Sequence, residues 1–309
     1  MFKAVAFVVS LVAAVQSSSV FKNAFQAASI DTPGLVSKAI PPRNLSLDLV
    51  RPADTSAIDK SLGSCTVTLV KNYTFGFSYG KPYRGQIPKH KCMDDPAYSL
   101  VYLRFSATVD RGQQFDRIAA VWIDGLELLR STTQEPSSSV GPSWEVFKEI
   151  SHYRKSLRQG SNVTIALDNI VDQTYTSYFH VNVTIEFYKK KANVFAIQAV
   201  PKLPDLVIPI FHKNDTYPWF NVQPSSSGQN FNWVTLPRNL DSLYLELFVS
   251  HHGCDEFYYG NPPDEYMEAL GSSCGSGSFR EIQVLIDDEP VAAIWPFTLI
   301  YTGGLSPAL

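Results

Sequence analysis

Short runs of alternating apolar and polar residues recur along the chain, and they predict strands rather than helices. Between 180 and 187 the odd positions are valine, isoleucine or phenylalanine, and the even positions are polar. This period of two places the apolar side chains on one face, as in a half-buried strand of an antiparallel sheet. Comparable runs lie at 65–70, 98–109, 163–167, 243–249, 282–286 and 291–300, and nearly every residue of 118–123 is apolar. Only 145–158 has a helical pattern, which is weak, and we expect a helix there.

Turn-forming residues separate these runs and divide the chain into two regions. Segments 134–142 and 223–230 are rich in Ser, Gly and Pro, which favour loops. Near 189–204, two prolines follow the three lysines 189–191. We interpret this lysine run as part of a solvated linker; the alternative is a patch for an anionic ligand.

Many short strands between turns indicate a sandwich or a jelly roll. We therefore expect an all-β fold with two tandem jelly-roll modules, each an antiparallel β-sandwich. The expected division is an extended lead-in over 19–43, a first module over 44–190, a linker over 191–204 and a second module over 205–309. Because the second region contains few strand-like runs, we expect part of its sheet to be missing.

The first residues have the pattern of a secretory signal peptide. Lys3 precedes an apolar run from Ala4 to Val15, which ends in the small polar stretch 16–19. We expect a signal peptide over 1–18 and a secreted protein, or one retained in a secretory compartment. The alternative, a buried N-terminal helix, would need a cap or a polar face that the run does not have.

Cysteines and glycosylation sequons agree with secretion. The chain has 4 cysteines, which allow three disulfide connectivities. We favour the local pairs Cys65 with Cys92 and Cys254 with Cys274, because each pair would close one loop region. The Asn-x-Ser/Thr sequons, which are candidate N-glycosylation sites, lie at Asn44, Asn72, Asn162, Asn182 and Asn214.

Composition excludes two classes of function. The formal net charge is -3 and the isoelectric point is about 6.1, which disfavours a protein that binds nucleic acid through its phosphates. No apolar run reaches the roughly 18 to 20 residues of a membrane-spanning helix. The 13% of aromatic residues agree with a strand-rich chain.

Two motifs suggest chemistry that their surroundings do not favour. The segment 271–275 (GSSCG) matches the G-x-S-x-G pattern of serine hydrolases, but that pattern needs a strand before the serine and a helix after it. His251 and His252 are adjacent, so on a strand they would point to opposite faces and would not share one metal ion. We interpret them as the polar end of a strand that leads into a disulfide.

Carboxylates at strand ends are better candidates for acid–base hydrolysis. Asp116 directly precedes the apolar run 118–123, and Asp168 ends the run 163–167. Glu256 follows Cys254, so a disulfide would hold it, and Glu281 opens the run 282–286. Taken singly, each of these acids also fits a solvated surface position.

Longer segments resemble the peptide N-glycanase A family of plants and fungi, the secretory glycopeptide amidases. The resemblance extends over roughly 44–303 and is most specific in the block 115–136, which contains FDRIAAVWI and STTQEP. Matching stretches follow in order at 65–69, 79–82, 163–169, 178–183, 253–258 and 279–284. Because family members extend well past Gly304, we expect this chain to be a fragment or a shortened gene model.

A fainter resemblance to the bacterial peptide N-glycosidase F, which is built of two jelly rolls, implies roles for individual residues. The principal catalytic aspartate of that relative lies in a Trp-Asp-Arg-Tyr-Ala stretch before a strand, and Asp116 matches it within FDRIA. One supporting glutamate there follows a strand end, where this chain has the shorter Asp168. The other lies in a Gly-Cys-Ala-Glu-Trp stretch, which 253–257 (GCDEF) matches locally. The register through Phe279 and Arg280, however, places its counterpart beside Glu281. Glu256 and Glu281 therefore both remain candidates, with Glu256 slightly favoured.

The resemblance implies an amidase that cleaves the side-chain amide between Asn and the first N-acetylglucosamine of N-linked glycoproteins and converts Asn to Asp. Asp116 would contact the scissile linkage and the attacking water, and the glutamate of the second module would share proton transfer. Arg117 or Arg280 would steady the oxyanion, Asp168 would bind the sugar or hold Asp116, and an exposed Tyr258 would stack on a sugar ring. We expect a monomer that needs no metal or organic cofactor. The alternatives are a truncated, inactive remnant that binds carbohydrate, or a glycosidase.

Overall fold

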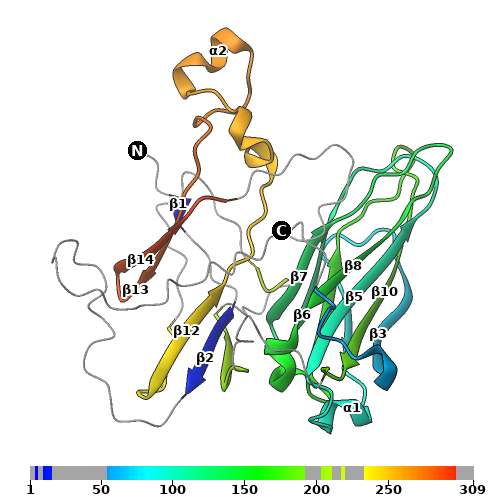
Figure 1. Cartoon of the computed structure of the whole chain (residues 1–309). Helices are drawn as coiled ribbons and strands as arrows, with labels where there is room; N and C mark the ends of the chain where they lie inside the picture. The colour runs from blue at the N-terminus through cyan, green and yellow to red at the C-terminus, as the bar shows by residue number, and fades with distance from the viewer. Residues whose placement is uncertain are drawn as a thin grey trace.

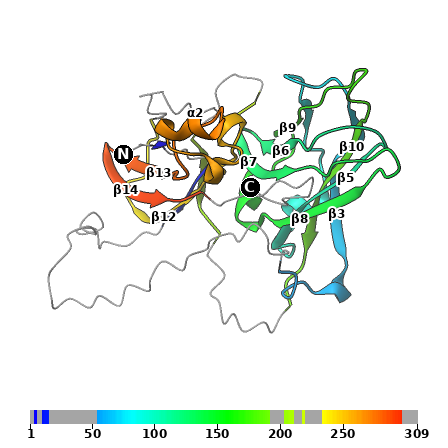
Figure 2. The same ribbon diagram turned by 90° about the horizontal axis from the view of Figure 1, so that it is seen from above.

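The structure is a computed structural model that describes residues 54–191, 203–210, 217–219 and 233–296, together with the backbone of 4–5 and 10–15. Two strand-rich regions lie side by side, and the helices are few and short (Figures 1 and 2). Almost all strand pairs are antiparallel. The expected all-β class is confirmed.

The first region is a sandwich of two four-stranded sheets. One sheet has the order β3-β10-β5-β8, formed by β3 (Ser64–Phe75), β10 (Phe179–Tyr188), β5 (Leu100–Val109) and β8 (Ser143–Glu149). The other has the order β4-β9-β6-β7, formed by β4 (Tyr83–Gln86), β9 (Asn162–Leu167), β6 (Ile118–Ile123) and β7 (Leu126–Thr132). In chain order the first sheet holds the first, eighth, third and sixth strands of the sandwich, and the second sheet holds the rest. This is the strand order of a jelly roll, so the jelly-roll prediction is confirmed for this region.

Because neighbouring strands are antiparallel, the loops that connect them lie at the two opposite ends of the sandwich. The loops 110–117, 133–142 and 168–178 leave or enter strands at one end. The opposite end carries the short helix α1 (Lys91–Asp94) and a 3-10 helix at Ser151–Ser156. The three loops of the first end therefore come together although they are distant in sequence.

The core of the first region lies between its two sheets. In β10 the odd positions Val181, Val183, Ile185 and Phe187 are all buried, as the period of two predicts. They meet equally buried side chains of the facing sheet, such as Val121. Burying one such side chain contributes about 1.5–3 kcal/mol, so this core dominates the stability of the region.

The sheet β4-β9-β6-β7 is covered on its outer face as well, which explains the unbroken apolar run of β6. Tyr217 and Trp219 pack on Trp122 and its small neighbours Ala120 and Ala166. A strand buried on both faces needs apolar residues at every position. The continuous apolar run at 118–123 is therefore explained by the packing of Tyr217 and Trp219 on the outer face of β6.

The second region contains smaller sheets. Its strands are β11 (Leu206–Pro209), β12 (Leu240–Glu246), β13 (Ile282–Ile286) and β14 (Glu289–Ile294), and α2 spans Met267–Leu270. Its buried cluster consists of Ile282 and Val284 with three partly buried neighbours. Short 3-10 turns at 253–255, 258–260 and 264–266 make up the segment between β12 and α2.

Two strands come from the segment that the sequence predicts to be a signal peptide. β1 (Ala4–Val5) pairs with β13, and β2 (Ser10–Val15) lies between β11 and β12. The signal peptide and the module boundaries stay predictions. The missing part of the second sheet also stays a prediction.

Several other expectations can be compared with the structure. The local disulfides Cys65–Cys92 and Cys254–Cys274 are confirmed. The helix expected over 145–158 is wrong, because alternating burial makes its first residues part of β8 and a 3-10 helix follows. Among the sequons, Asn72, Asn162 and Asn182 are exposed, and Asn44 and Asn214 lie outside the described residues. No helix in the described part of the chain is long and apolar enough to cross a membrane.

Candidate active site

The hairpin of β6 and β7 places Asp116 beside Glu135. Ile118 of β6 is paired with Thr132 of β7, and just beyond this pair the Thr133 N–H donates to the carbonyl of Arg117 at 2.9 Å. Asp116 directly precedes Arg117, and its N–H donates to Glu135 Oε1 at 3.2 Å. The register of one hairpin therefore fixes two carboxylates next to each other.

These two carboxylates line a cleft of about 380 Å³ that both regions build. The first region contributes Phe115, Asp116, Arg117, Ile118 and Glu135, and the second contributes His251, His252, Glu256 and Phe257. A cleft of this size and origin, between two modules, is a common position for a binding site.

A series of polar contacts leads the second region along the first sandwich to the cleft. At the end of β12, Glu246 accepts from Lys148 of β8 at 2.9 Å. Lys148 and then His152 hold the pKa of Glu246 at about 2, although burial opposes them. Further along, Arg130 of β7, which is paired with the buried Glu127, donates to the Ser250 hydroxyl at 3.1 Å. His251 and His252 follow directly and enter the cleft.

The neighbouring carboxylates of the cleft help to raise the pKa of Asp116. Burial, a hydrogen bond with Glu135 and the negative charges of Glu135 and Glu256 raise the pKa of Asp116 to about 6. Two close carboxylates cannot both ionise easily, so such a pair tends to hold one proton. Asp116 can therefore change its protonation state in weakly acidic solution.

Arg117 is the cation nearest to these acids in the sequence, and its side chain is held in place. Its Nη1 donates to the Tyr79 hydroxyl at 3.2 Å and its Nη2 to Gln114 Oε1 at 2.5 Å. The guanidinium also lies 5.8 Å from the ring centre of Tyr175. A fixed guanidinium at the wall of a cleft is suited to binding an oxyanion or a sugar hydroxyl.

Asp168 does not line the cleft but lies close behind it. It accepts a hydrogen bond from the Tyr217 hydroxyl, which itself accepts from the Gly80 N–H at 3.0 Å. Burial raises the pKa of Asp168, while Tyr217, the Gly80 amide and the charge of Arg117 act against this rise. Asp168 therefore anchors Tyr217, which belongs to the chain beyond the first sandwich, and lies near enough to Arg117 to feel its charge.

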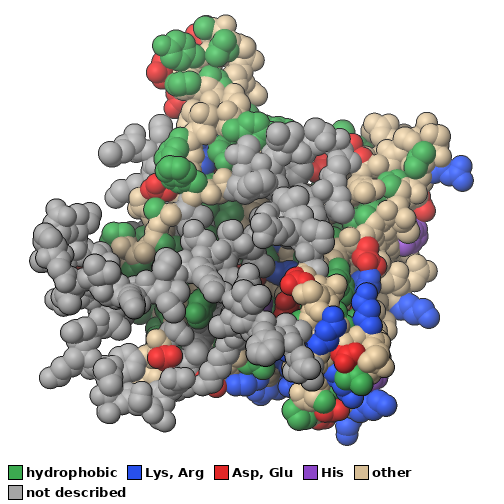
Figure 3. All heavy atoms as spheres, viewed as in Figure 1, with side chains coloured by type: hydrophobic (Ala, Val, Ile, Leu, Met, Phe, Trp, Pro, Cys, Tyr) green, Lys and Arg blue, Asp and Glu red, His purple; other side chains and the backbone are tan. Residues whose placement is uncertain are grey.

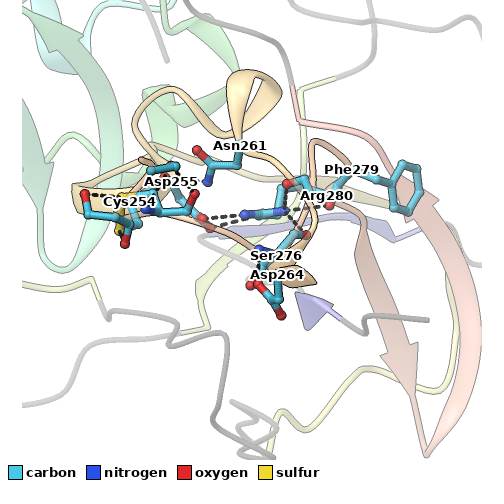
Figure 4. A network of polar contacts seen from close by, with 11 residues as sticks. Cys254, Asp255, Asn261, Asp264, Ser276, Phe279 and Arg280 are labelled. Carbon is cyan, nitrogen blue, oxygen red and sulfur yellow. Dashed lines mark hydrogen bonds and ion pairs between the residues drawn. A yellow bond between two sulfur atoms is a disulfide. The ribbon is translucent and has the colours of Figure 1, made fainter. Parts of the chain in front are cut away.

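Glu256 is carried by a turn that is cross-linked in two ways. The disulfide Cys254–Cys274 joins this turn to the chain after α2. Arg280 donates to both carboxylate oxygens of Asp255, at 3.1 and 2.7 Å, and its Nη1 donates to the carbonyls of Ser276, Gly277 and Phe279 (Figure 4). The turn thus presents Glu256 to the cleft from a braced segment.

Besides Asp168, three further predicted site residues lie away from the cleft lining. Arg280 is engaged by Asp255 and the loop carbonyls, so its role in the described structure is to brace the Glu256 turn. Glu281 accepts from Gln283 at 2.8 Å and from Trp295 Nε1 at 3.2 Å. The expectation that Tyr258 is exposed is wrong, because it is only 5% exposed, packs against His251 and donates to the Pro296 carbonyl.

Glu135 and the histidine pair are cleft residues that the sequence reasoning missed. Glu135 lies in the segment 134–142, for which the sequence predicts only a loop, and its position beside Asp116 follows from the register of β6 and β7. His252 accepts or donates a hydrogen bond with the Ser250 hydroxyl at 2.9 Å. Burial, Arg130 and His251 lower the pKa of His252, which favours its neutral form.

The structure also groups potential metal ligands at one position outside the cleft. The ligand atoms of Cys65, His90 and Cys92 lie within 4.8 Å of one another. The two sulfurs are bonded to each other, whereas a cysteine binds metal as a thiolate. With its disulfide intact, this group does not fit a metal ion.

Comparisons with known proteins agree on one family. Residues 52–309 match the family model of peptide N-acetyl-beta-D-glucosaminyl asparaginase amidase A. A peptide-N4-(N-acetyl-beta-glucosaminyl)asparagine amidase A from Prunus dulcis is 38% identical over 257 residues, which cover 78% of this chain and 44% of that protein. This chain therefore spans less than half the length of that relative.

Similarity to solved structures is weak. A structure of PNGF-II has a TM-score of 0.31 with 12% identity and covers 42% of this chain and 35% of its own. The subviral particle of infectious bursal disease virus VP2 has a TM-score of 0.25 with 9% identity over 40% of this chain and 32% of its own. At these values neither likeness bears on function.

Proposed function

The chain belongs to the peptide N-acetyl-beta-D-glucosaminyl asparaginase amidase A family, and from this membership we propose that it is a glycopeptide amidase. Its substrate is an N-glycosylated protein or peptide, and the bond it breaks is the amide between the Asn side chain and the first N-acetylglucosamine. The products are a peptide with Asp at that position and a glycosylamine, which decays to the free sugar.

The observation that carries this proposal is the cleft in which Asp116 and Glu135 are adjacent and Glu256 enters from the other region. An amide is a poor electrophile, so its hydrolysis needs an activated water, a stabilised oxyanion and a protonated leaving nitrogen. Three carboxylates and one fixed guanidinium in the cleft lining can supply these functions. Of the two glutamates considered from sequence, Glu256 is the one in the cleft.

Asp116 takes the central role in this mechanism. In its ionised form, above its pKa of about 6, it accepts a proton from the attacking water, beside the carboxylate of Glu135. The proton taken from water is then passed to the leaving nitrogen, and Glu256, on the opposite wall, shares in this transfer. Arg117, held in place by Tyr79 and Gln114, stabilises the charge that develops on the amide oxygen.

Family membership and the predicted leader also support a location in the secretory pathway. Two disulfides agree with an oxidising compartment. We propose a monomer that is glycosylated on the exposed sequons Asn72, Asn162 and Asn182.

The test is mass spectrometry of a glycopeptide incubated with the purified chain, an Asp116→Asn variant and an Asp110→Asn control. Asp110 is an exposed acid on the same loop, outside the cleft. We expect glycan release with conversion of Asn to Asp by the wild type and the control, and none by Asp116→Asn. Sugar left on Asn would indicate a glycosidase, and binding without any conversion would indicate a carbohydrate-binding remnant.

A further inference from the structure

A second hollow lies at the end of the first sandwich opposite the catalytic cleft. It has a volume of about 450 Å³ and is lined by the residues before and within α1 and by the chain from the 3-10 helix 151–156 to Gln159. The cleft is formed by loops 110–117 and 133–142, whereas this hollow is formed by connections at the other ends of the same strands. The two sites are therefore separated by the length of the sandwich.

The lining of this hollow is strongly basic. Lys89, Arg154, Lys155 and Arg158 line it together with His90, and the single carboxylate in the lining is Asp94. Figure 3 shows Lys and Arg side chains gathered over this lower end of the first region. The whole chain has a formal net charge of -3, so this concentration of positive charge is local and runs against the overall charge.

Most of these cations are not neutralised by carboxylates of the described residues. Lys155 forms an ion pair with Asp205 at 3.1 Å. Arg154 donates instead to the carbonyls of Tyr98 and Asp95, both at 2.8 Å, and Arg158 donates to the carbonyl of Lys155 at 3.0 Å. Carbonyl acceptors fix a guanidinium in place but leave its full charge, so the hollow has a positive potential.

The framework of the hollow is rigid. Arg154 ties the 3-10 helix to the chain that follows α1, and the disulfide Cys65–Cys92 anchors α1 itself, with Cys92 fully buried. The ammonium of Lys189, the first residue of the three-lysine run, lies 5.1 Å from the ring centre of Tyr98, the residue whose carbonyl accepts from Arg154 Nε. The run is thus partly packed against this end of the sandwich rather than wholly a solvated linker.

We propose that this hollow is a binding site for an acidic polysaccharide, recognised through its sulfate or carboxylate groups. Basic side chains in a hollow of this size fit a chain of anionic sugars, which needs charge and hydrogen-bond donors. Single-stranded nucleic acid requires aromatic rings for base stacking, and peripheral membrane binding requires exposed apolar side chains beside the charges. The lining of the hollow contains no Phe, Tyr or Trp side chain, and its apolar members Met93 and Leu157 are partly or fully buried.

The experiment measures binding of the full chain to dextran sulfate and to polygalacturonate, with neutral dextran as the uncharged reference. The test variant is Lys89→Ala/Arg158→Ala, and both side chains are exposed. The matched control removes two exposed charges elsewhere, as Lys71→Ala/Arg111→Ala. We expect the test variant to weaken binding at least about tenfold and the control less than about twofold. Which polymer binds distinguishes sulfate from carboxylate as the recognised group.

Three results would overturn the proposal. They are no binding to either polymer at low ionic strength, an equal loss in both double variants, and tighter binding to single-stranded DNA or anionic vesicles than to both polysaccharides. Cleavage of a small neutral glycopeptide should be the same for wild type and Lys89→Ala/Arg158→Ala, because the hollow lies away from the catalytic cleft.

Discussion

The two regions hold their cleft residues by different physical means. Asp116 and Glu135 extend directly from paired strands of a jelly roll with a large buried core. Glu256 lies in a turn of a region whose buried cluster is small, and a disulfide and the five hydrogen bonds that Arg280 donates hold that turn. One half of the site is therefore positioned by packing and the other half by cross-links.

Because of this difference, we expect substitutions in the two regions to affect stability and activity differently. A change in the first region affects the site through the core and strand register, which also determine stability. A change in the cross-links of the second region can displace Glu256 while the first sandwich stays folded. Kinetics and stability measurements together can therefore separate the two halves.

The largest expected effect is that of Asp116→Asn. Loss of the carboxylate removes the group proposed to activate water, so kcat/KM for a glycopeptide should fall by about 10³-fold or more. The folded-state pKa of Asp116, about 6, lies above the unfolded value of about 3.9. The ionised carboxylate therefore costs stability as the pH rises through this interval. Thermal unfolding at neutral pH should show a variant at least as stable as the wild type, and a clearly less stable variant would argue for a structural role.

The next largest effect separates Glu256 from Glu281. Glu256→Gln should lower kcat/KM by about 10²-fold, because Glu256 is the acid that faces Asp116 across the cleft. Glu281→Gln is the matched control, and it should change kcat/KM less than about threefold. Steady-state kinetics of the two variants tests this directly, and the reverse order would return the role to Glu281.

Removal of the cross-link should have an intermediate effect confined to the second region. In Cys254→Ser/Cys274→Ser the turn that carries Glu256 loses its disulfide, and we expect kcat to fall about tenfold. Such a disulfide typically stabilises by about 2–4 kcal/mol, here within the second region. Hydrogen exchange should show faster exchange around 253–275 and unchanged protection in β5, β6 and β10. Equal loss of protection in both regions would contradict the division described above.

The smallest effect concerns the pH dependence of activity. If ionised Asp116 is the base, kcat/KM should decline below about pH 6, the pKa of Asp116. Glu135→Gln removes one neighbouring negative charge, so the pKa of Asp116 should fall and the acidic limb should move to lower pH by up to about one unit. The pH profile of kcat/KM for both proteins measures this shift. An unmoved limb would mean that Glu135 is not coupled to Asp116.

The sequence predicts the first region well because its signals are local. The period of two in 180–187 and the apolar run 118–123 correspond to β10 and β6, and the acid before β6 lines the cleft. The helix predicted over 145–158 is wrong because the alternating burial of β8 depends on its pairing with β5, which is distant in sequence.

The positions of the remaining cleft residues depend on contacts between segments distant in sequence, which no local sequence pattern predicts. Glu135 meets Asp116 only through the register of two strands, and His251 and His252 reach the cleft because Arg130 and Lys148 align the chain before them. The proposal of Glu256 rather than Glu281 likewise rests on the packing of the two regions, which brings Glu256 into the cleft lining.

The most direct test of the proposed amidase is hydrolysis of a defined glycopeptide in ¹⁸O-labelled water, followed by mass spectrometry of both products. If water attacks the Asn side-chain amide, the label appears in the new Asp carboxyl of the peptide. Peptide that retains Asn, with the label on a sugar released by glycosidic cleavage, would contradict the account, as would no reaction by the folded chain.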